Sequence, residues 1–359
     1  MSKTFEKRKA VLDKYIKEKW DEHFWEFVMK HEKKIDWYML SQNPNLTMEM
    51  IEQHPDKPWY WESISHNPNL TIEMIERHSD KAWNWNWISK NPNLTMEIIE
   101  QYPDKPWIWN YVSQNPNITL EMIEQNPPKP WDWWYISNNP NLTMDFIERY
   151  PNKLFNWSYI SKNPNLTIDM IERHPDKRWV WRDVSSNSNL KMDVIEQYPN
   201  KPWEWEWISK NPNLTMDMIE RHLDKPWRWG WISENPNITI DFIERHIKKP
   251  WNWNYISRNP NLTFEMIEQH PDKPWDWWSI SENPNLTMDF IERHSHKPWK
   301  WNYISENLFE KEKELFYEKW YRKYMAVFRL QQYYNLALDN PKYKLCRDLF
   351  NKKWEEEES

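Results

Sequence analysis

Four residue types return at a fixed spacing of 24 residues in this sequence, and each could in principle do chemistry. Trp recurs from Trp61 to Trp301, Lys from Lys57 to Lys297 and Ser from Ser41 to Ser305, and His recurs from His54 with several exceptions. Aligned Trp rings can stack nucleic-acid bases, and aligned Lys can contact phosphates. His clusters can bind metal ions, and Ser can act as a nucleophile.

The Trp and Lys columns also have a structural explanation, which we favour. A Trp in every repeat, as in the columns of Trp59 and Trp61, is what a stacked hydrophobic core requires. The stem of a Lys can pack along such a Trp while its charge stays in water or meets a carboxylate. The columns of Glu49 and Glu52 add 22 carboxylates, against six Arg in the column of Gln53. That acidic surface repels a polyanion.

The His and Ser columns lack the surroundings that chemistry needs. Tyr or Asn replaces His at Tyr102, Asn126, Tyr150 and Tyr198, and Tyr is a poor substitute for a zinc ligand. Packed helical layers are ~8–10 Å apart, so neighbouring His side chains do not share one ion. No Ser-His-Asp spacing recurs with the Ser column, whose hydroxyls we expect to bond backbone in a turn. We therefore predict no catalytic residue, no metal site and no cofactor, and no enzyme activity.

The composition narrows the class of protein. The chain has 359 residues, a formal charge of −7 and a mean hydropathy of −1.07, yet 17% of its residues are aromatic and 31 are Trp. A single Gly excludes Gly-rich phosphate loops, and a single Cys, Cys346, excludes a disulfide framework and a Cys-ligated cluster. No signal peptide or membrane-spanning run is recognisable, so we expect an intracellular protein that is not secreted and has no membrane partner.

The 24-residue step defines the organisation of the chain. Eleven repeats, ten opening with Asn-Pro-Asn and one with Asn187-Ser188-Asn189, fill residues 43–306 without insertion or deletion. Residues 19–42 form a degenerate earlier repeat. We predict an N-terminal helical cap with that repeat over residues 1–42, the eleven repeats over 43–306, and a C-terminal helical cap and charged tail over 307–359.

The first full repeat, residues 43–66, serves as the template for naming columns. Asn43-Pro44-Asn45 predicts a turn, and Thr47 an N-cap for a helix over 48–54. Residues 58–65 align best at three residues per turn, which favours a short 3₁₀ or irregular helix. Helices this short are marginal alone, so the repeats must stack. We predict an all-α solenoid, rod-like or superhelical and about 100 Å long.

Variable columns indicate where a partner could bind. Residue type changes from repeat to repeat in the columns of Tyr60, Glu62 and His66, which are therefore expected to be exposed. The tail adds an aromatic stripe at helical spacing that starts at Phe316 and is expected to cover an open end of the array beside Trp301 and Ile304. The candidate partner-binding residues are Trp134, Arg182, Arg228, Trp278, Trp320, Tyr324 and Phe328.

The recurring motifs Asn-Pro-Asn-Leu-Thr, Asp-Lys-Pro-Trp and Ile-Ser resemble those of known repeat families. It is similar to the 24-residue leucine-rich variant repeat, a right-handed solenoid of alternating α and 3₁₀ helices, and more closely to tandem-repeat proteins of giant viruses of the mimivirus kind. The leucine-rich variant family can carry an N-terminal Cys cluster for an iron–sulfur centre. This chain has no Cys before Cys346, so the resemblance does not imply that cofactor here.

These observations predict a non-enzymatic repeat scaffold that mediates protein–protein interaction. The resemblance implies a viral protein acting in the host cytoplasm or the virion. One alternative is a nucleic-acid-binding repeat protein that uses the Lys57 column and exposed aromatic side chains. The other is a structural virion protein that self-associates through its aromatic tail.

Burial in the Trp61 column can be tested by substitution. Trp181→Ala should lower the free energy of unfolding by about 3–5 kcal/mol because it truncates a buried aromatic side chain. Trp134→Ala, in a column that is otherwise mostly polar, should cost far less. Equal shifts of the urea midpoint for the two variants would show that the burial assignment is wrong.

Overall fold

The computed structural model describes the backbone of residues 3–338 and the side chains of residues 9–324 and 326. The described residues form 25 helices and no strand, which confirms the predicted all-α repeat fold. Backbone contacts divide them into two parts. We call residues 28–309 the repeat ring, and residues 3–27 with 310–338 the helix pair. None of the described helices combines the length and apolar character needed to cross a membrane.

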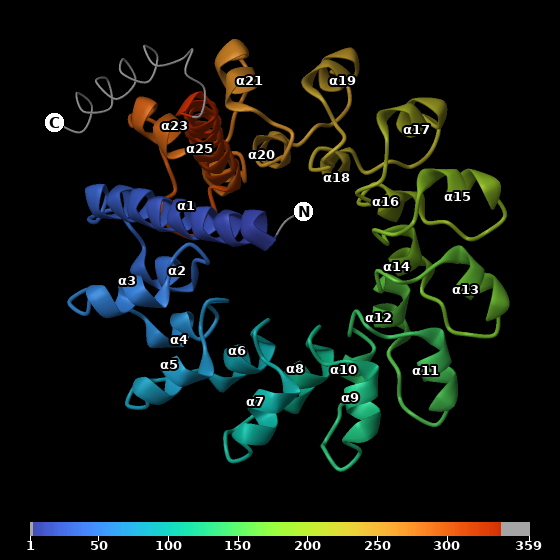
Figure 1. Cartoon of the computed structure of the whole chain (residues 1–359). Coiled ribbons are helices and arrows are strands. Elements are labelled where there is room, and N and C mark those ends of the chain that lie inside the picture. Colours follow the sequence, from blue (N-terminus) through green and yellow to red (C-terminus); the bar gives the residue numbers. More distant parts are fainter. Residues whose placement is uncertain (1–2, 339–359) are drawn as a thin grey trace. The chain divides into compact units, whose positions relative to one another are not determined.

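Each repeat contributes two short helices. In Figure 1 the first helices form an outer layer and the second helices an inner layer of the repeat ring. The first helices are α3 (Met48–Gln53), α5 (Ile72–Arg77), α7 (Met96–Gln101), α9 (Leu120–Gln125), α11 (Met144–Arg149), α13 (Ile168–Arg173), α15 (Met192–Gln197), α17 (Met216–Arg221), α19 (Ile240–Arg245), α21 (Phe264–Gln269) and α23 (Met288–Arg293). The second helices are α2 (Trp37–Gln42), α4 (Trp61–Ile64), α6 (Trp85–Lys90), α8 (Trp109–Gln114), α10 (Trp133–Ile136), α12 (Trp157–Lys162), α14 (Trp181–Ser185), α16 (Trp205–Ile208), α18 (Trp229–Ile232), α20 (Trp253–Ser257), α22 (Trp277–Glu282) and α24 (Trp301–Glu306).

Local sequence explains where the first helices begin and which face they bury. Thr47 Oγ1 accepts a hydrogen bond from the backbone N–H of Met50 at 3.2 Å, as the N-cap assignment predicts. The same cap recurs in most repeats; Lys191 lacks it because its side chain has no acceptor. The Ile51 column is buried in every full repeat, while the Glu49 column is exposed. One turn and a half of helix thus presents an apolar face inward and an acidic face outward.

The second helices are short α-helices whose last turn tightens. Ile64 N–H donates to Tyr60 C=O, the four-residue step of an α-helix, whereas Asn67 N–H donates to Ile64 C=O over three residues. The predicted 3₁₀ geometry is therefore confined to the end of the segment. The Ser65 hydroxyl explains part of the difference between the predicted 3₁₀ helix and the observed α-helix, because it donates to Trp61 C=O four residues earlier at 3.0 Å.

Two ladders of buried polar side chains join consecutive repeats. The Ser65 hydroxyl accepts from the backbone N–H of Asn84 in the next repeat at 2.9 Å. Asn67 Nδ2 donates to the backbone C=O of Asn43 in the previous repeat at 3.0 Å. The same pair of bonds recurs at every junction between full repeats. Because the partners lie one repeat apart, the ladders fix both register and spacing.

The last repeat closes onto the first. Asp36 N–H donates to Ser305 Oγ at 2.9 Å, and Asn43 Nδ2 donates to the backbone C=O of Ser305 at 2.9 Å and of Asn307 at 3.1 Å. These are the bonds that join internal repeats, and α2 packs directly on α24. Figure 1 shows the resulting closed circuit of helices. The degenerate repeat therefore acts as a twelfth member of the ring. Twelve members complete one full turn, so each is rotated by about 30° from the one before it.

Closure corrects two expectations. The array of repeats is a ring rather than a rod or open superhelix, and its end beside Trp301 and Ile304 is not open. Ile304 is buried, and Trp301 packs against His31 at 4.8 Å between ring centroids. The predicted domain boundaries after residues 42 and 306 stay a prediction.

The helix pair consists of most of α1 (Lys3–Lys30) and all of α25 (Glu310–Leu338). Trp20 is fully buried and meets Phe316 edge-on at 5.5 Å. Tyr15 meets Trp320 in the same way at 5.6 Å. The predicted aromatic stripe of the tail thus packs on α1. The Tyr321 hydroxyl donates to the Asp13 carboxylate, a bond that raises the pKa of Tyr321 to about 12.

Matched Asn→Ala substitutions test ring closure. Asn43 lies at the junction of the last and first repeats, and Asn163 occupies the same column in mid-array, where Nδ2 donates to Asn139 C=O at 3.0 Å. Both side chains are buried, so each substitution should cost about 1–3 kcal/mol by leaving buried acceptors unpaired. Urea titration should give equal midpoint shifts. A neutral Asn43→Ala beside a destabilising Asn163→Ala would contradict closure.

Candidate functional site

The two Trp columns lie in the interface between repeats. Trp61 meets Trp83 of the next repeat edge-on at 5.2 Å and 85°, and this pairing recurs around the ring, with Phe155 once in place of Trp. The indole N–H of Trp59 donates to His54 C=O at 2.7 Å. The Trp59 column is the more buried of the two, because its members end inside the turn that follows the first helix. The Trp61 column, which the sequence predicted to be buried, is half-buried in every full repeat except at Trp229, so Trp181→Ala truncates a half-buried ring. Neither column is free to stack bases.

The other uniform columns are engaged in the same way. Lys153 Nζ lies 4.7 Å from the ring centre of Trp133 in the previous repeat, as the packed-stem interpretation predicts. His78 packs on Trp61 at 5.0 Å, and its Nε2 lies 3.2 Å from Glu52 Oε1. Among the described residues, no group of three or more His, Cys, Asp or Glu side chains is arranged to hold a metal ion.

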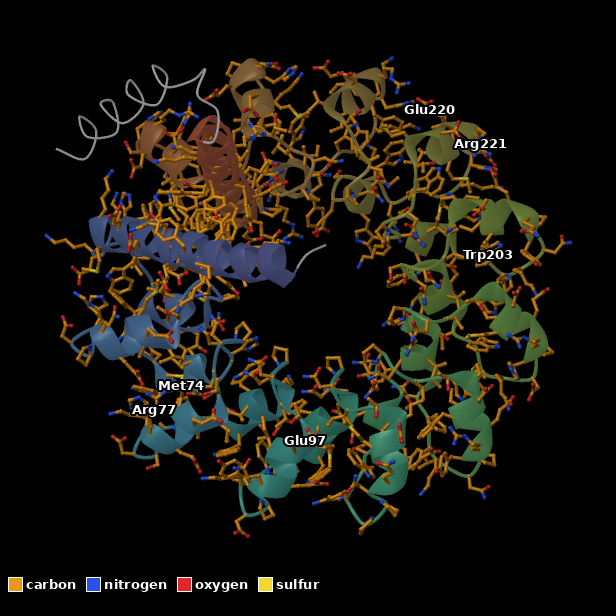
Figure 2. All side chains as sticks on the ribbon, viewed as in Figure 1. Met74, Arg77, Glu97, Trp203, Glu220 and Arg221 are labelled. Atoms are coloured by element: carbon orange, nitrogen blue, oxygen red, sulfur yellow. The ribbon has the colours of Figure 1, made fainter. Side chains whose placement is uncertain are left out.

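The outer layer carries a ladder of ion pairs. Arg77 Nη1 lies 2.8 Å from Glu52 Oε1 of the previous repeat, and Arg245 and Arg293 repeat this contact. Figure 2 labels Arg77, Glu220 and Arg221 on this outer layer. These contacts are exposed, so each contributes little to stability. The columns of Glu49 and Glu52 are acidic in every full repeat and only six repeats carry the Arg, so the outer surface is acidic.

A cavity of about 570 Å³ lies between the first two full repeats, lined by both Trp columns together with Arg77 and Lys81. Its cations already have carboxylate partners. Arg77 pairs with Glu52, Lys57 with Glu32 at 2.7 Å, and Lys81 with Asp80 at 2.9 Å. The cavity therefore has the size of a ligand site without a free charge to orient a ligand.

The variable columns gather on the second helices. We call their exposed and half-exposed residues, from the columns of Tyr60, Glu62, Ser63 and His66, the inner face. Figure 2 shows side chains of these helices directed toward the middle of the ring. The inner face changes at every repeat, whereas the core columns exchange mainly one apolar residue for another and the outer columns of Glu49 and Glu52 stay acidic.

Two of the predicted binding residues are the most exposed Trp side chains described. Trp134 is 52% exposed and Trp278 is 55% exposed. They occupy the same column six repeats apart in a ring of twelve, so they lie on opposite sides of the inner face. Each lies two residues after the Asp that caps its helix, which is Asp132 for α10 and Asp276 for α22.

The two predicted Arg residues also lie on the inner face, two repeats apart, and both contact residues of the repeat between them. The Arg182 guanidinium sits 5.1 Å from the ring centre of Trp207, and its Nε lies 3.3 Å from the buried carboxylate of Asp183. Arg228 pairs with Glu206 at 2.7 Å and lies 5.9 Å from the ring centre of Trp231.

The predicted tail residues belong to the other part of the molecule. Trp320 and Tyr324 lie on α25 in the helix pair, where Tyr324 is partly exposed. The side chain of Phe328 lies outside the described residues. The predicted residues therefore do not all converge on one site, and the four in the ring form the coherent group.

Sequence reasoning missed the Ser63 column. It holds Trp or Tyr in eight of the eleven full repeats and Ser63, Asp183 or Ser279 in the others, so its pattern is neither uniform like the core nor polar like a surface. Its rings hold two lysines. Lys90 Nζ lies 4.6 Å from the ring centre of Trp87 and 4.0 Å from that of Tyr111. Lys210 Nζ lies 4.4 Å from Trp231 and 5.4 Å from Trp207. The sequence signal that could have identified this column is an aromatic residue followed three positions later by Lys, as in Trp87 and Lys90 or Trp207 and Lys210.

Charge along the inner face is divided between two arcs. In the His66 column, the first seven full repeats carry no acidic residue, and they include Lys90, Lys162 and Lys210. The last four carry Glu234, Arg258, Glu282 and Glu306. Arg258 bridges Glu234 at 2.9 Å and Glu282 at 3.4 Å. We name two stretches of the inner face after the charge of the His66 column: the cationic arc, from Lys90 to Lys210, and the acidic arc, from Glu234 to Glu306. The other inner-face columns of the cationic arc also carry acidic residues, which are Asp132, Asp183, Glu204 and Glu206.

No protein-family model matches this chain, and no curated protein or solved structure matches it either. The structure itself confirms the tandem helical repeat. Membership of the leucine-rich variant family and a viral origin stay predictions.

The pKa of His66 reports the inner face directly. Burial against Trp87 lowers it below the ordinary value, Lys90 lowers it further, and Glu306, two members away around the closed ring, raises it. Lys90→Met should therefore raise the His66 pKa, and Glu306→Gln should lower it, because each removes one charge. NMR titration of the His66 ring proton, assigned with His66→Gln, measures both shifts. A His66 pKa unaffected by Glu306→Gln would contradict the proximity of first and last repeats.

Proposed function

We propose that this protein is a non-enzymatic scaffold that binds a protein partner on the inner face of the ring. Helical repeat architecture is typical of protein-interaction scaffolds, because stacked repeats present a long continuous surface. One observation carries the proposal: residue identity varies most on the inner face, where the columns of Tyr60, Glu62 and His66 hold eight, six and seven residue types over the eleven full repeats. A surface that differs at each repeat can recognise a sequence of different groups, whereas the acidic outer layer offers much the same contact many times.

The chemistry of the inner face supports a protein partner. The inner face has exposed Trp and Arg and half-exposed Tyr, which are the residue types that contribute most at protein interfaces. Trp134 and Trp278 give two large anchors on opposite sides of the ring. The absence of an enzyme activity belongs to this proposal and rests on the lack of catalytic spacing in the sequence.

Nucleic-acid binding is a second candidate, favoured by the lysines held over Trp and Tyr rings. Residues 37–306 carry 27 basic and 37 acidic side chains, however, so most of the ring surface repels a phosphate backbone. A viral source and action in the host cytoplasm or virion are further proposals, and they rest on the resemblance of the Asn-Pro-Asn-Leu-Thr wording alone. Self-association through the tail is a third candidate.

Affinity capture with and without nuclease tests the proposed function. The bait is the full chain, its inner-face variant Trp134→Ala Trp278→Ala, and the outer-layer control Arg77→Ala Arg221→Ala, each incubated with lysate of the cells that make the protein. Captured proteins should survive nuclease, disappear with the inner-face variant and persist with the control. Loss of the captured proteins on nuclease treatment would favour the nucleic-acid candidate. Equal capture by all three baits would contradict an inner-face site.

A further inference from the structure

The cationic arc of the inner face contains lysines fixed in place without a carboxylate partner. Lys90 contacts Trp87 and Tyr111, and Lys210 contacts Trp207 and Trp231, so each ammonium is held between rings of two neighbouring repeats. Both residues are exposed. No carboxylate of the described residues lies within 4.0 Å of either ammonium. Such a lysine loses little side-chain freedom when it meets an anion.

Most acidic groups in the same repeats are already engaged. The Asp183 carboxylate is 1% exposed, accepts from the Ser158 hydroxyl and lies 3.4 Å from Lys162 Nζ. Glu62 accepts from Asn84 Nδ2, and Glu206 pairs with Arg228. The half-exposed Asp132 accepts from the backbone N–H groups that begin α10, and Glu204 is the exposed exception. Lys90, Lys210 and the exposed Arg182 are therefore the cations that this arc offers to a partner, against the carboxylates of Glu204 and the capping Asp132.

We propose that the cationic arc, from Lys90 to Lys210, binds an extended acidic peptide segment of the protein partner. This inference rests on the proposed function and names the chemistry of its partner. Carboxylates of the segment meet the fixed ammonium groups, and its intervening residues pack on the Tyr and Trp rings between them. An acidic segment has one place to bind, because the outer layer and the arc from Glu234 to Glu306 both repel it.

Geometry sets the length of the segment. Lys90 and Lys210 are five repeats apart. Packed helices lie about 8–10 Å apart, so the arc is roughly 45 Å long and about 14 extended residues span it. A peptide also fits the charge distribution better than RNA, since a polyanion with a charge at every nucleotide would extend into the acidic arc.

Fluorescence anisotropy with three probes tests the inference. The probes are a fluorescein-labelled peptide of alternating Glu and Ser, about 14 residues long, its counterpart with Lys in place of Glu, and oligouridine of about the same length. The Glu peptide should bind the full chain more tightly than the other two, and NaCl should weaken the binding. Lys90→Gln and Lys210→Gln should each weaken it about fivefold, and together about 25-fold.

Lys153→Gln is the matched control. It removes the same charge from a Lys that also lies over a Trp, at 4.7 Å, but in the Lys57 column outside the inner face. Its affinity for the Glu peptide should stay within about twofold of the parent chain.

Three results would overturn the inference. They are stronger binding of the Lys peptide, equal losses from Lys153→Gln and Lys210→Gln, and tighter binding of oligouridine that depends on Lys90 and Lys210. If the Glu peptide does not bind while Trp134→Ala Trp278→Ala still releases the captured proteins, the partner is not acidic and the proposed function stands. If neither effect is seen, both fail.

Discussion

The hydrogen bonds from each buried Ser and Asn to the backbone of a neighbouring repeat are the constraint on which the ring depends. Helices of four to six residues have almost no stability of their own, so tertiary contacts must hold them. The Ser hydroxyl accepts from a backbone N–H at the start of the second helix in the next repeat. The Asn side-chain amide donates to a backbone carbonyl in the turn of the previous repeat. Shifting one repeat against its two neighbours would break these hydrogen bonds at both of its junctions. The shift costs free energy because the buried polar groups are then left unpaired.

The Trp columns complete that constraint by filling the space between repeats. Each edge-on pair joins two repeats. The indole N–H of each Trp in the Trp59 column also donates to a backbone carbonyl in the turn that precedes it. With core and ladders uniform, the chain can change the inner face without disturbing the fold. The division between uniform interfaces and a variable surface is therefore what allows twelve nearly identical layers to present different side chains, and it is the physical basis for the proposed scaffold role.

Sequence alone predicted the features that depend on local chemistry. The Thr47 cap, the buried Ile51 column and the Ser65 hydroxyl bonded to backbone follow from residue type and spacing, and the structure confirms them. Closure was missed, because a 24-residue period fixes the length of a repeat and says nothing of its rotation. The degenerate repeat of residues 19–42, in which Trp37 and Ser41 fit the columns of Trp61 and Ser65, pointed to a twelfth member but not to its contact with the last repeat. The Ser63 column was missed because mixed Trp, Tyr, Ser and Asp suggest neither core nor surface.

Closure of the ring is the central claim, and a distance between spin labels tests it most directly. Labels at Tyr38→Cys and Asn302→Cys, in a Cys346→Ser background, mark equivalent positions in the first and last members, and labels at Glu62→Cys and Asn86→Cys mark two adjacent internal repeats. A closed ring predicts the same short distance for both pairs, because each spans one junction. A short distance for the internal pair together with a separation approaching ~100 Å for residues 38 and 302, as an open array of packed helices requires, would contradict the account.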